Sequence, residues 1–288
     1  MSTVTRFAPS PTGYLHLGHA YSALFAARFT TGHGERFLVR IEDIDPERCR
    51  PEFEQAIMDD LAWLGLTWEV PVRRQSEHMA DYAAALDVLD GLGLLYPCFC
   101  TRADIRREIE AAGYAPHDAP SGPDGPIYPG TCREINPSER HDRLSSGEAY
   151  ALRLDMTKAI GQAIEQAGTL TWCDHERGEQ ITTPEIFGDV VLARKDTPTS
   201  YHLAVTVDDH LQGITLVTRG EDLFSASHIH RLLQALLGYE TPDYHHHALL
   251  SGDDGKRFAK RDKAATLHDL RQSGVAAIDI IRKLGIAG

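Results

Sequence analysis

The sequence has 288 residues, of which 42% are apolar and 25% are charged, and it carries a formal net charge of −13. This composition is typical of a soluble globular protein that buries a sizeable core. It contains neither an apolar run long enough to span a membrane nor a signal peptide, which predicts a cytoplasmic protein, and its acidity argues against indiscriminate nucleic-acid binding.

The first third of the chain shows a strand–helix–strand pattern followed by two helical patterns. Residues 3–7 and 36–41 are predicted strands, and a helix is expected between them over residues 19–31. A unit of this kind belongs to a parallel sheet. Apolar residues at helical spacing then predict helices over residues 51–64 and 78–92.

The middle of the chain differs in composition from the start. Glycine and proline dominate residues 113–147, which predicts a loop-rich insertion without a helix or strand layer of its own. A strand-rich block is expected over residues 149–219, followed by a helix over 225–237 and two short helices near the end. The strands expected in that block are 170–173, 190–194, 204–207 and 214–218, and the last two helices are 266–272 and 276–284.

The alternation of strands and helices predicts an α/β fold, in which a Rossmann-like nucleotide-binding domain is interrupted by a smaller subdomain. We expect four parts along the chain. They are the first half of the core domain at 1–96, the insertion at 97–148, the remainder of the core at 149–250, and a C-terminal segment with short helices at 251–288.

The most informative motif begins at the end of the first strand. The run Arg-Phe-Ala-Pro-Ser-Pro-Thr-Gly at residues 6–13 precedes His-Leu-Gly-His at residues 16–19, where the first helix begins. A helix N-terminus presents backbone N–H groups and a partial positive charge, and therefore suits a phosphate. The two histidines add donors, and Gly13 and Gly18 allow a ligand to approach the backbone closely. A helix-capping loop with incidental histidines is the alternative.

This motif is similar to the HIGH signature of class I aminoacyl-tRNA synthetases, in the form used by the glutamyl branch. The resemblance implies a class I catalytic domain, with a Rossmann-like fold and an inserted subdomain, that activates an amino acid with ATP. It implies catalytic roles for His16 and His19. It also implies that Pro9, Gly13, His16, Gly18 and His19 bind ATP and that Arg6, Ala8 and Ser10 bind glutamate.

Three further residues suit a dicarboxylic amino acid. Glu42 follows the second strand, where open α/β sheets place their ligand crevice, and its carboxylate could hold an ammonium group. Arg219 can pair bidentately with a carboxylate. The same resemblance makes Glu42, Tyr201 and Arg219 parts of a glutamate pocket, with Arg6 as a second candidate for a substrate carboxylate. Each residue also has a structural interpretation when it is taken alone. Glu42 could cap a loop, Tyr201 could be an ordinary strand residue, and Arg219 could pair with a neighbouring acid.

The run Arg-Phe-Ala-Lys-Arg at residues 257–261 takes the place of the second class I signature, the KMSKS loop. The resemblance implies that Lys260 stabilises charge on the ATP phosphates and that Arg257 contacts ATP. The match is degenerate, because arginine replaces the first lysine and both serines are missing. Lys256 could take the first position in a register shifted by one residue. On charge alone, the segment would be a solvated basic loop.

Three cysteines have a spacing that allows a metal site. Cys98 and Cys100 are separated by one residue, and Cys132 follows about thirty residues later. Three thiols can occupy three corners of a tetrahedral zinc site, although buried free thiols are the alternative. The resemblance to truncated glutamyl-tRNA synthetases implies one structural zinc ion with Tyr128 as the fourth ligand. His117 is chemically the more conventional fourth ligand and stays open as an alternative.

Two cysteines, Cys49 and Cys173, fall outside this pattern and are interpreted as structural. The odd total of cysteines fits a reducing cytosol better than a disulfide framework. The three adjacent histidines at 245–247 lie in a short strand-like stretch, where neighbouring side chains point to opposite faces. We therefore interpret them as structural or as flanking ATP, and not as one metal site.

Fewer than thirty residues follow Lys260, so the sequence resembles the catalytic half of a glutamyl-tRNA synthetase without an anticodon-binding domain. The stand-alone family with this architecture and cysteine pattern is that of the glutamyl-queuosine tRNA(Asp) synthetases. The resemblance implies a monomer that forms glutamyl-adenylate from L-glutamate and ATP with Mg²⁺, without needing tRNA. It then transfers glutamate to the queuosine cyclopentenediol in the anticodon of tRNA(Asp).

Two alternatives to this function stay open. One is a minimal glutamyl-tRNA synthetase that charges a tRNA 3′ end through the same site. The other is a catalytically silent paralogue that binds tRNA or a protein partner, which the degenerate KMSKS loop favours.

Overall fold

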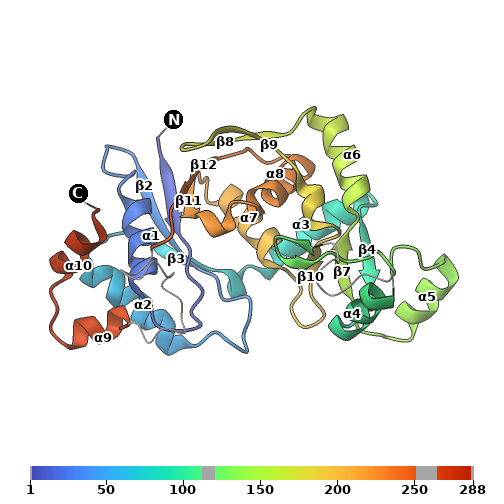
Figure 1. Cartoon of the computed structure of the whole chain (residues 1–288), viewed down its shortest axis with the longest axis horizontal. Coiled ribbons are helices and arrows are strands. Elements are labelled where there is room, and N and C mark those ends of the chain that lie inside the picture. Colours follow the sequence, from blue (N-terminus) through green and yellow to red (C-terminus); the bar gives the residue numbers. More distant parts are fainter. Residues whose placement is uncertain (1, 112–120, 251–264, 287–288) are drawn as a thin grey trace.

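A computed structural model describes residues 2–111, 121–250 and 265–286 of the protein. The molecule is elongated (Figure 1): the first strands and the C-terminal helices lie at one end, and the helices α4 and α5 lie at the other. None of the helices in the described ranges is long and apolar enough to cross a membrane.

A parallel sheet forms the N-terminal end of the molecule. The strands β1 (Val4–Phe7), β2 (Arg36–Ile41) and β3 (Glu69–Arg74) are adjacent in this order, with Arg6 in register with Leu38. The helix α1 (Leu17–Ala27) connects β1 to β2. The predicted strand–helix–strand unit is therefore confirmed.

A second sheet continues beside β1. The backbone N–H of Thr215, immediately before β11, donates to the carbonyl of Val4 at 3.0 Å. From β11 the strands follow in the order β11-β12-β8-β9, and all pairs but β8–β9 are parallel. Their bounds are β8 (Thr171–Asp174), β9 (Gly178–Ile181), β11 (Leu216–Gly220) and β12 (Asp243–His247).

The strands in the middle of the chain are antiparallel, and they include residues on both sides of the predicted insertion. One sheet has the order β10-β7-β4, and a short hairpin pairs β5 with β6. These strands are β4 (Leu95–Cys98), β5 (Ser121–Gly122), β6 (Gly125–Pro126), β7 (Ala151–Leu154) and β10 (Val191–Ala193).

Helices cover these sheets and connect them. They are α2 (Pro51–Trp63), α3 (Met79–Gly91), α4 (Arg102–Ala111), α5 (Pro137–Ser145), α6 (Met156–Ala167), α7 (Tyr201–Leu211), α8 (Ala226–Leu237), α9 (Leu267–Gln272) and α10 (Ala277–Leu284). Three short 3₁₀ helices are Gln75–Glu77, Pro184–Phe187 and Glu221–Leu223.

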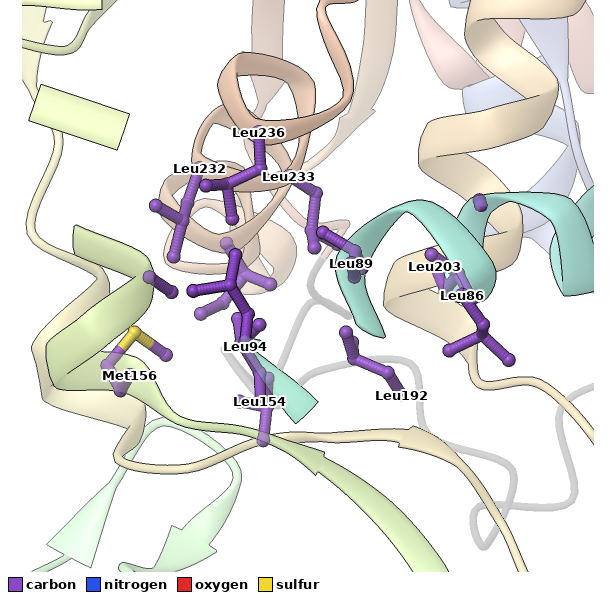
Figure 2. Packing of buried hydrophobic residues seen from close by; sticks show 14 of the residues in the cluster. Leu86, Leu89, Leu94, Leu154, Met156, Leu192, Leu203, Leu232, Leu233 and Leu236 are labelled. Carbon is purple, nitrogen blue, oxygen red and sulfur yellow. The ribbon is translucent and has the colours of Figure 1, made fainter. Parts of the chain in front are cut away.

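Two main cores hold the elements together. In one, leucines of α3, α7 and α8 interdigitate with Leu154 of β7 and Leu192 of β10 (Figure 2). In the other, α1, α2 and β2 pack against α9 and α10, which contribute Leu267 and Leu284. The second core therefore fixes the C-terminal helices against the N-terminal sheet, close to the motif at residues 6–19.

Three predictions of secondary structure are wrong. Residues 204–207, predicted as a strand, lie within the helix α7, because Ser200 caps the helix and Leu203, Ala204 and Val207 are buried together against the core. The segment that begins at residue 149 holds the helix α6, capped by Asp155, as well as strands. The Gly/Pro-rich insertion contains the helix α5, which starts at Asn136 and Pro137, a capping residue and a first-turn proline.

Candidate active site

A cavity of about 750 Å³ lies at the carboxyl ends of β1, β2 and β11. The chain leaves β1 toward β2 on one side, whereas it leaves β11 toward β12 on the other side. The boundary between β1 and β11 is therefore the topological switch point of the sheet, where open α/β sheets bind their ligands. The described residues that the sequence predicted as binding groups all line this one cavity: Arg6, Ala8, Pro9, Ser10, Gly13, His16, Gly18, His19, Glu42, Tyr201 and Arg219.

The two histidines of the first motif form the N-terminal cap of α1. Nδ1 of His16 accepts a hydrogen bond from the backbone N–H of Gly18 at 3.1 Å, and the backbone N–H of His16 donates to Nδ1 of His19 at 3.2 Å. The two rings stack with centroids 3.8 Å apart. Because both Nδ1 atoms accept, the neutral form of each ring carries its proton on Nε2. The cap therefore adds two imidazole donors to the N-terminal end of the helix dipole.

Gly18 lies close to the ring of His16. A Cβ at this position would lie 3.0 Å from Cε1 of His16, closer than side chains normally approach. A larger residue here would therefore require the His16 ring to shift within the cap.

A buried ion-pair network lies below the cavity. Asp209 on α7 binds Arg6 through both carboxylate oxygens, at 2.9 and 3.2 Å, and also binds Arg40 at 2.8 Å. Burial acts to raise the pKa of Asp209, but the two guanidinium groups hold it below its ordinary value. The third nitrogen of Arg6 donates to the carbonyl of Thr218. Arg6 is therefore engaged by protein groups at all three nitrogens.

Glu42 lies at the end of β2, beside the same network. Its carboxylate is 9% exposed and lies 3.4 Å from Arg40. Burial raises the pKa of Glu42 despite the nearby charges of Arg40 and Arg6. An ammonium group in the cavity would restore the lost solvation of this carboxylate, so the position suits a cationic ligand group.

Arg219 on β11 has a different environment from Arg6. Its side chain donates from Nε to His246 at 3.1 Å, from Nη1 to His230 at 3.2 Å and from Nη2 to Ser227 at 2.5 Å. Burial lowers the pKa of His246 to about 4, and that of His230 also falls well below its ordinary value, so both rings are neutral acceptors.

No ion pair within residues 2–111, 121–250 and 265–286 includes Arg219, although its residue is only 6% exposed. A guanidinium has five N–H donors, so one hydrogen remains on each terminal nitrogen. A buried cation without a carboxylate partner is costly. The cavity thus holds one desolvated guanidinium that can receive a carboxylate from a ligand.

Tyr201 is the first residue of α7 and lines the cavity above this network. Its ring lies 5.7 Å from the ring of His230, and burial raises the pKa of its hydroxyl group. The phenol is therefore protonated at neutral pH and offers the cavity a neutral donor.

Arg257, Lys260 and the alternative residue Lys256 lie outside the described residues, as does His117. The flanks of the segment 251–264 nevertheless reach the cavity. Leu250 lines it, and the backbone N–H of Leu267 donates to the carbonyl of Leu15, next to His16, at 2.8 Å.

A second group of candidate ligands lies in the insertion. The Sγ atoms of Cys98, Cys100 and Cys132 all lie within 4.8 Å of one another, in a small core with Tyr128. The Tyr128 hydroxyl lies 3.4 Å from Sγ of Cys100 and accepts from the backbone N–H of Cys132 at 2.8 Å. Three convergent thiols and a phenol oxygen are a donor set that fits zinc, so these residues could hold a metal ion.

The two remaining cysteines and the histidine run lie outside the cysteine cluster. Cys49 lines the cavity and Cys173 is exposed on β8. In β12, His245 packs against Phe25 of α1, whereas His246 binds Asp174 on the opposite face of the strand. The prediction that the three adjacent histidines do not converge on one site is confirmed.

Sequence reasoning missed the residues that hold the two arginines. The sequence assigned no role to Asp209, eight residues after Tyr201, and none to His230 and Ser227 on α8. Their partners are distant in the chain. The one available signal was the occurrence of polar side chains at helical spacing with apolar ones, at 227, 230 and 234 in α8, all of which are buried.

Comparisons with known proteins agree with this geometry. Residues 2–288 match the family described as tRNA synthetases class I (E and Q), catalytic domain. A glutamyl-Q tRNA(Asp) synthetase from Rhodobacter capsulatus is 48% identical, with 98% of this chain and 100% of the relative covered. A glutamate–tRNA ligase from Hydrogenobaculum is 36% identical, with 99% of this chain and 58% of the relative covered.

Among solved structures, a glutamate tRNA ligase from Elizabethkingia meningosepticum in complex with its amino acid superimposes with a TM-score of 0.79 at 27% identity. The match covers 100% of this chain and 61% of that chain. The chain thus spans about three fifths of the length of the glutamate ligases and the full length of the glutamyl-Q relative from Rhodobacter.

Proposed function

The chain belongs to the family of class I tRNA synthetase catalytic domains for glutamate and glutamine, and on this basis we propose that it transfers glutamate to queuosine in tRNA(Asp). In the first step, the α-carboxylate of L-glutamate attacks the α-phosphorus of ATP, and pyrophosphate leaves. In the second, a hydroxyl of the queuosine cyclopentenediol attacks the carbonyl carbon of glutamyl-adenylate. AMP leaves, the hydroxyl proton is lost, and an ester results.

One observation carries the choice of amino acid. Arg219 is a buried guanidinium that has only uncharged partners among the described residues, and it shares a cavity with the buried carboxylate of Glu42. The first group complements a carboxylate and the second complements an ammonium group. We assign Arg219 and Tyr201 to a substrate carboxylate, Glu42 to the amino group, and Ala8 and Ser10 to the wall of the pocket. Because Arg6 is engaged by Asp209 and Thr218, its role is to shape the field of the pocket, with a further ligand contact as a secondary role.

ATP would occupy the side of the cavity formed by Pro9, Gly13, Gly18 and the capped end of α1. The imidazole donors of His16 and His19 and the helix dipole favour the negative charge that develops on the phosphates. Lys260, with Arg257, is assigned to the same charge by the resemblance to the KMSKS loop, and the described flanks at Leu250 and Leu267 lie at the cavity and beside Leu15. Mg²⁺ would accompany ATP and share in neutralising the phosphates.

The cysteine cluster would hold one structural zinc ion through Cys98, Cys100, Cys132 and Tyr128. Zinc would link β4 to the segment at 128–132 and so supply stability to a part of the insertion with few buried residues. It is remote from the reaction, and we assign it no chemical step.

The comparison with relatives favours queuosine over a tRNA 3′ end as the acceptor. The identity is 48% to the glutamyl-Q relative from Rhodobacter and 36% to the glutamate ligase from Hydrogenobaculum. Charging of a 3′ end remains the second candidate, because the pocket described above would serve it equally well.

Glutamate-dependent exchange of labelled pyrophosphate into ATP, measured without tRNA, tests the first step. We expect exchange with L-glutamate and much less with L-glutamine or L-aspartate. L-glutamine lacks the side-chain carboxylate, and the side chain of L-aspartate is shorter. No exchange with any amino acid would contradict the proposal and favour the silent paralogue.

A further inference from the structure

Arg219 is held by side chains that do not themselves line the cavity. Its partners His230 and Ser227 lie on α8, and His230 in turn contacts His202 on α7, with 3.2 Å between Nε2 of His230 and Nδ1 of His202. Arg219 and Tyr201 line the cavity, whereas these three partners lie behind them. Any effect of the two histidines on a ligand must therefore act through Arg219, to which His230 is hydrogen-bonded, or through Tyr201, whose ring lies beside both.

The side chains of Arg219, His230, His202 and Asp124 form a series of hydrogen bonds, which we call the hydrogen-bond chain. Its hydrogen bonds can run in only one direction. A guanidinium donates and never accepts, so Nδ1 of His230 must accept from Arg219. The proton of the neutral His230 ring is then on Nε2, which donates to Nδ1 of His202. His202 in turn carries its proton on Nε2 and donates to the carboxylate of Asp124 at 3.2 Å. Each ring is fixed in one tautomer by its neighbour.

We propose that His230 and His202 are positioning residues for the substrate carboxylate: they fix the guanidinium of Arg219 in the orientation in which it lines the cavity. The inference rests on the proposed function, because it takes the carboxylate to be that of glutamate. The neutral imidazole of His230 meets a need that a carboxylate would not. It satisfies a donor of Arg219 without neutralising the charge of the guanidinium, which stays available for the ligand.

The electrostatic surroundings agree with a neutral His230 ring. His230 is 2% exposed and is approached by the charges of Arg219 and Arg6 and by the rings of His202 and His246. Burial, followed by these neighbours, lowers the pKa of His230 well below its ordinary value. A second proton on this ring would place a cation directly against Arg219 and break the hydrogen bond between them.

The last residue of the hydrogen-bond chain, Asp124, lies in the β5–β6 hairpin of the insertion. A Cβ on Gly122 would overlap the carbonyl oxygen of Ile186, so the hairpin can lie against the 3₁₀ helix Pro184–Phe187 only with glycine at this position. Phe187 from that helix contacts the ring of His202. Asp124 itself is 67% exposed, and solvent therefore screens its interaction with His202.

Steady-state pyrophosphate exchange with two variants of His230 tests the proposal. His230→Leu removes the acceptor at Nη1, and we expect the KM for glutamate to rise about tenfold or more, with the KM for ATP and kcat little changed. His230→Gln should restore a KM within about twofold of the wild-type value, because its amide oxygen can accept from Arg219 while its amide nitrogen donates to His202. Thermal unfolding confirms that each variant is folded.

A second set of variants changes the residues of the hydrogen-bond chain beyond His230. His202→Leu should raise the KM for glutamate, and its effect should not add to that of His230→Leu, because both interrupt one chain. Asp124→Ala should raise it no more than about fivefold, as expected for an exposed pair. His210→Leu, an exposed histidine on the same helix α7, is the matched control and should leave both KM values unchanged.

Three results would overturn the inference while the wild type shows exchange. They are an unchanged KM for glutamate in folded His230→Leu, an equal rise in the KM for ATP, or no recovery in His230→Gln. If His230→Leu does not fold, His202→Leu decides in the same way. Wild-type protein without glutamate-dependent exchange would instead contradict the proposed function, and the inference with it.

Discussion

Arg6 and Arg219 reach the same cavity from the neighbouring strands β1 and β11, but within the described part of the chain only Arg6 pairs with a carboxylate, that of Asp209. This asymmetry separates two tasks that a sequence motif cannot distinguish. One arginine completes a buried ion-pair network that holds β1 to α7. The other is supported by neutral side chains and keeps its charge for a ligand.

The two arginines should therefore differ in what their loss affects. Arg219→Leu should raise the KM for glutamate by about a hundredfold, because truncating one partner of a buried charge pair costs about 2–5 kcal/mol, while the free energy of unfolding changes little. Arg6→Leu should lower the free energy of unfolding by about 3 kcal/mol, because it removes the bidentate partner of a buried carboxylate. Urea unfolding and pyrophosphate exchange on both variants check this. Equal stability loss in the two would contradict the assignment.

The raised pKa of Glu42 predicts that the affinity of the protein for glutamate falls in acid. Burial raises its pKa, so as the pH falls this carboxylate is protonated before an ordinary glutamate would be, and it then loses its attraction for an ammonium group. The KM for glutamate should rise on the acid side before the substrate's own carboxylates titrate. Glu42→Gln should show a high KM at all pH values and lack this early rise. A wild-type KM in Glu42→Gln would remove Glu42 from the pocket.

The buried histidines predict a loss of stability in mild acid. The pKa values of His228, His230, His246 and His247 are all lowered, first by burial, and that of His246 falls to about 4. In the unfolded chain these groups titrate near pH 6.5, so below that pH the unfolded state binds more protons and is favoured.

Each of these groups should reduce the free energy of unfolding by about 1.4 kcal/mol per pH unit between its unfolded and folded pKa values. His246→Asn, which keeps a neutral donor near the position of Nδ1 for Asp174, should flatten the slope between pH 6.5 and about 4. Chemical unfolding at a series of pH values measures this slope. The same slope in wild type and variant would show that His246 does not contribute.

The cysteine cluster predicts a metal-dependent insertion. Cys98→Ser should lower the zinc content of the purified protein and the temperature of unfolding, because three convergent thiols supply most of the ligands. Cys173→Ser, an exposed cysteine outside the cluster, is the matched control and should change neither. Metal analysis and thermal unfolding, with and without a chelator, check both. Unchanged zinc in Cys98→Ser would remove the assignment.

The position of the cavity could be predicted from the sequence, because its motifs lie at the ends of strands. Residues 6–19 and Glu42 follow β1 and β2, and a parallel sheet necessarily brings such ends together. Arg219 lies at the carboxyl end of β11 and therefore reaches the same edge of the sheet. Local rules therefore locate these strand ends, whereas Tyr201, which begins the helix α7, was assigned by resemblance and not by such rules.

The supporting residues could not be predicted, because they are set by contacts over long distances in the chain. Arg6 and Asp209 are separated by 203 positions. The β-branched residues Val205, Thr206 and Val207 favour a strand locally, but the cap at Ser200 and burial against the core make α7 a helix. Only as a helix does this segment direct Asp209 to the arginines and His202 to His230.

Transfer of labelled glutamate to tRNA tests the central claim most directly. The enzyme, ATP and labelled L-glutamate would be incubated with total tRNA from cells that make queuosine and from cells that cannot, and labelled tRNA would be cut into anticodon and 3′-terminal fragments. We predict label only in the queuosine-containing pool, on the anticodon fragment of tRNA(Asp). Equal labelling of both pools, on the 3′-terminal fragment, would contradict the account and identify an enzyme that charges tRNA ends.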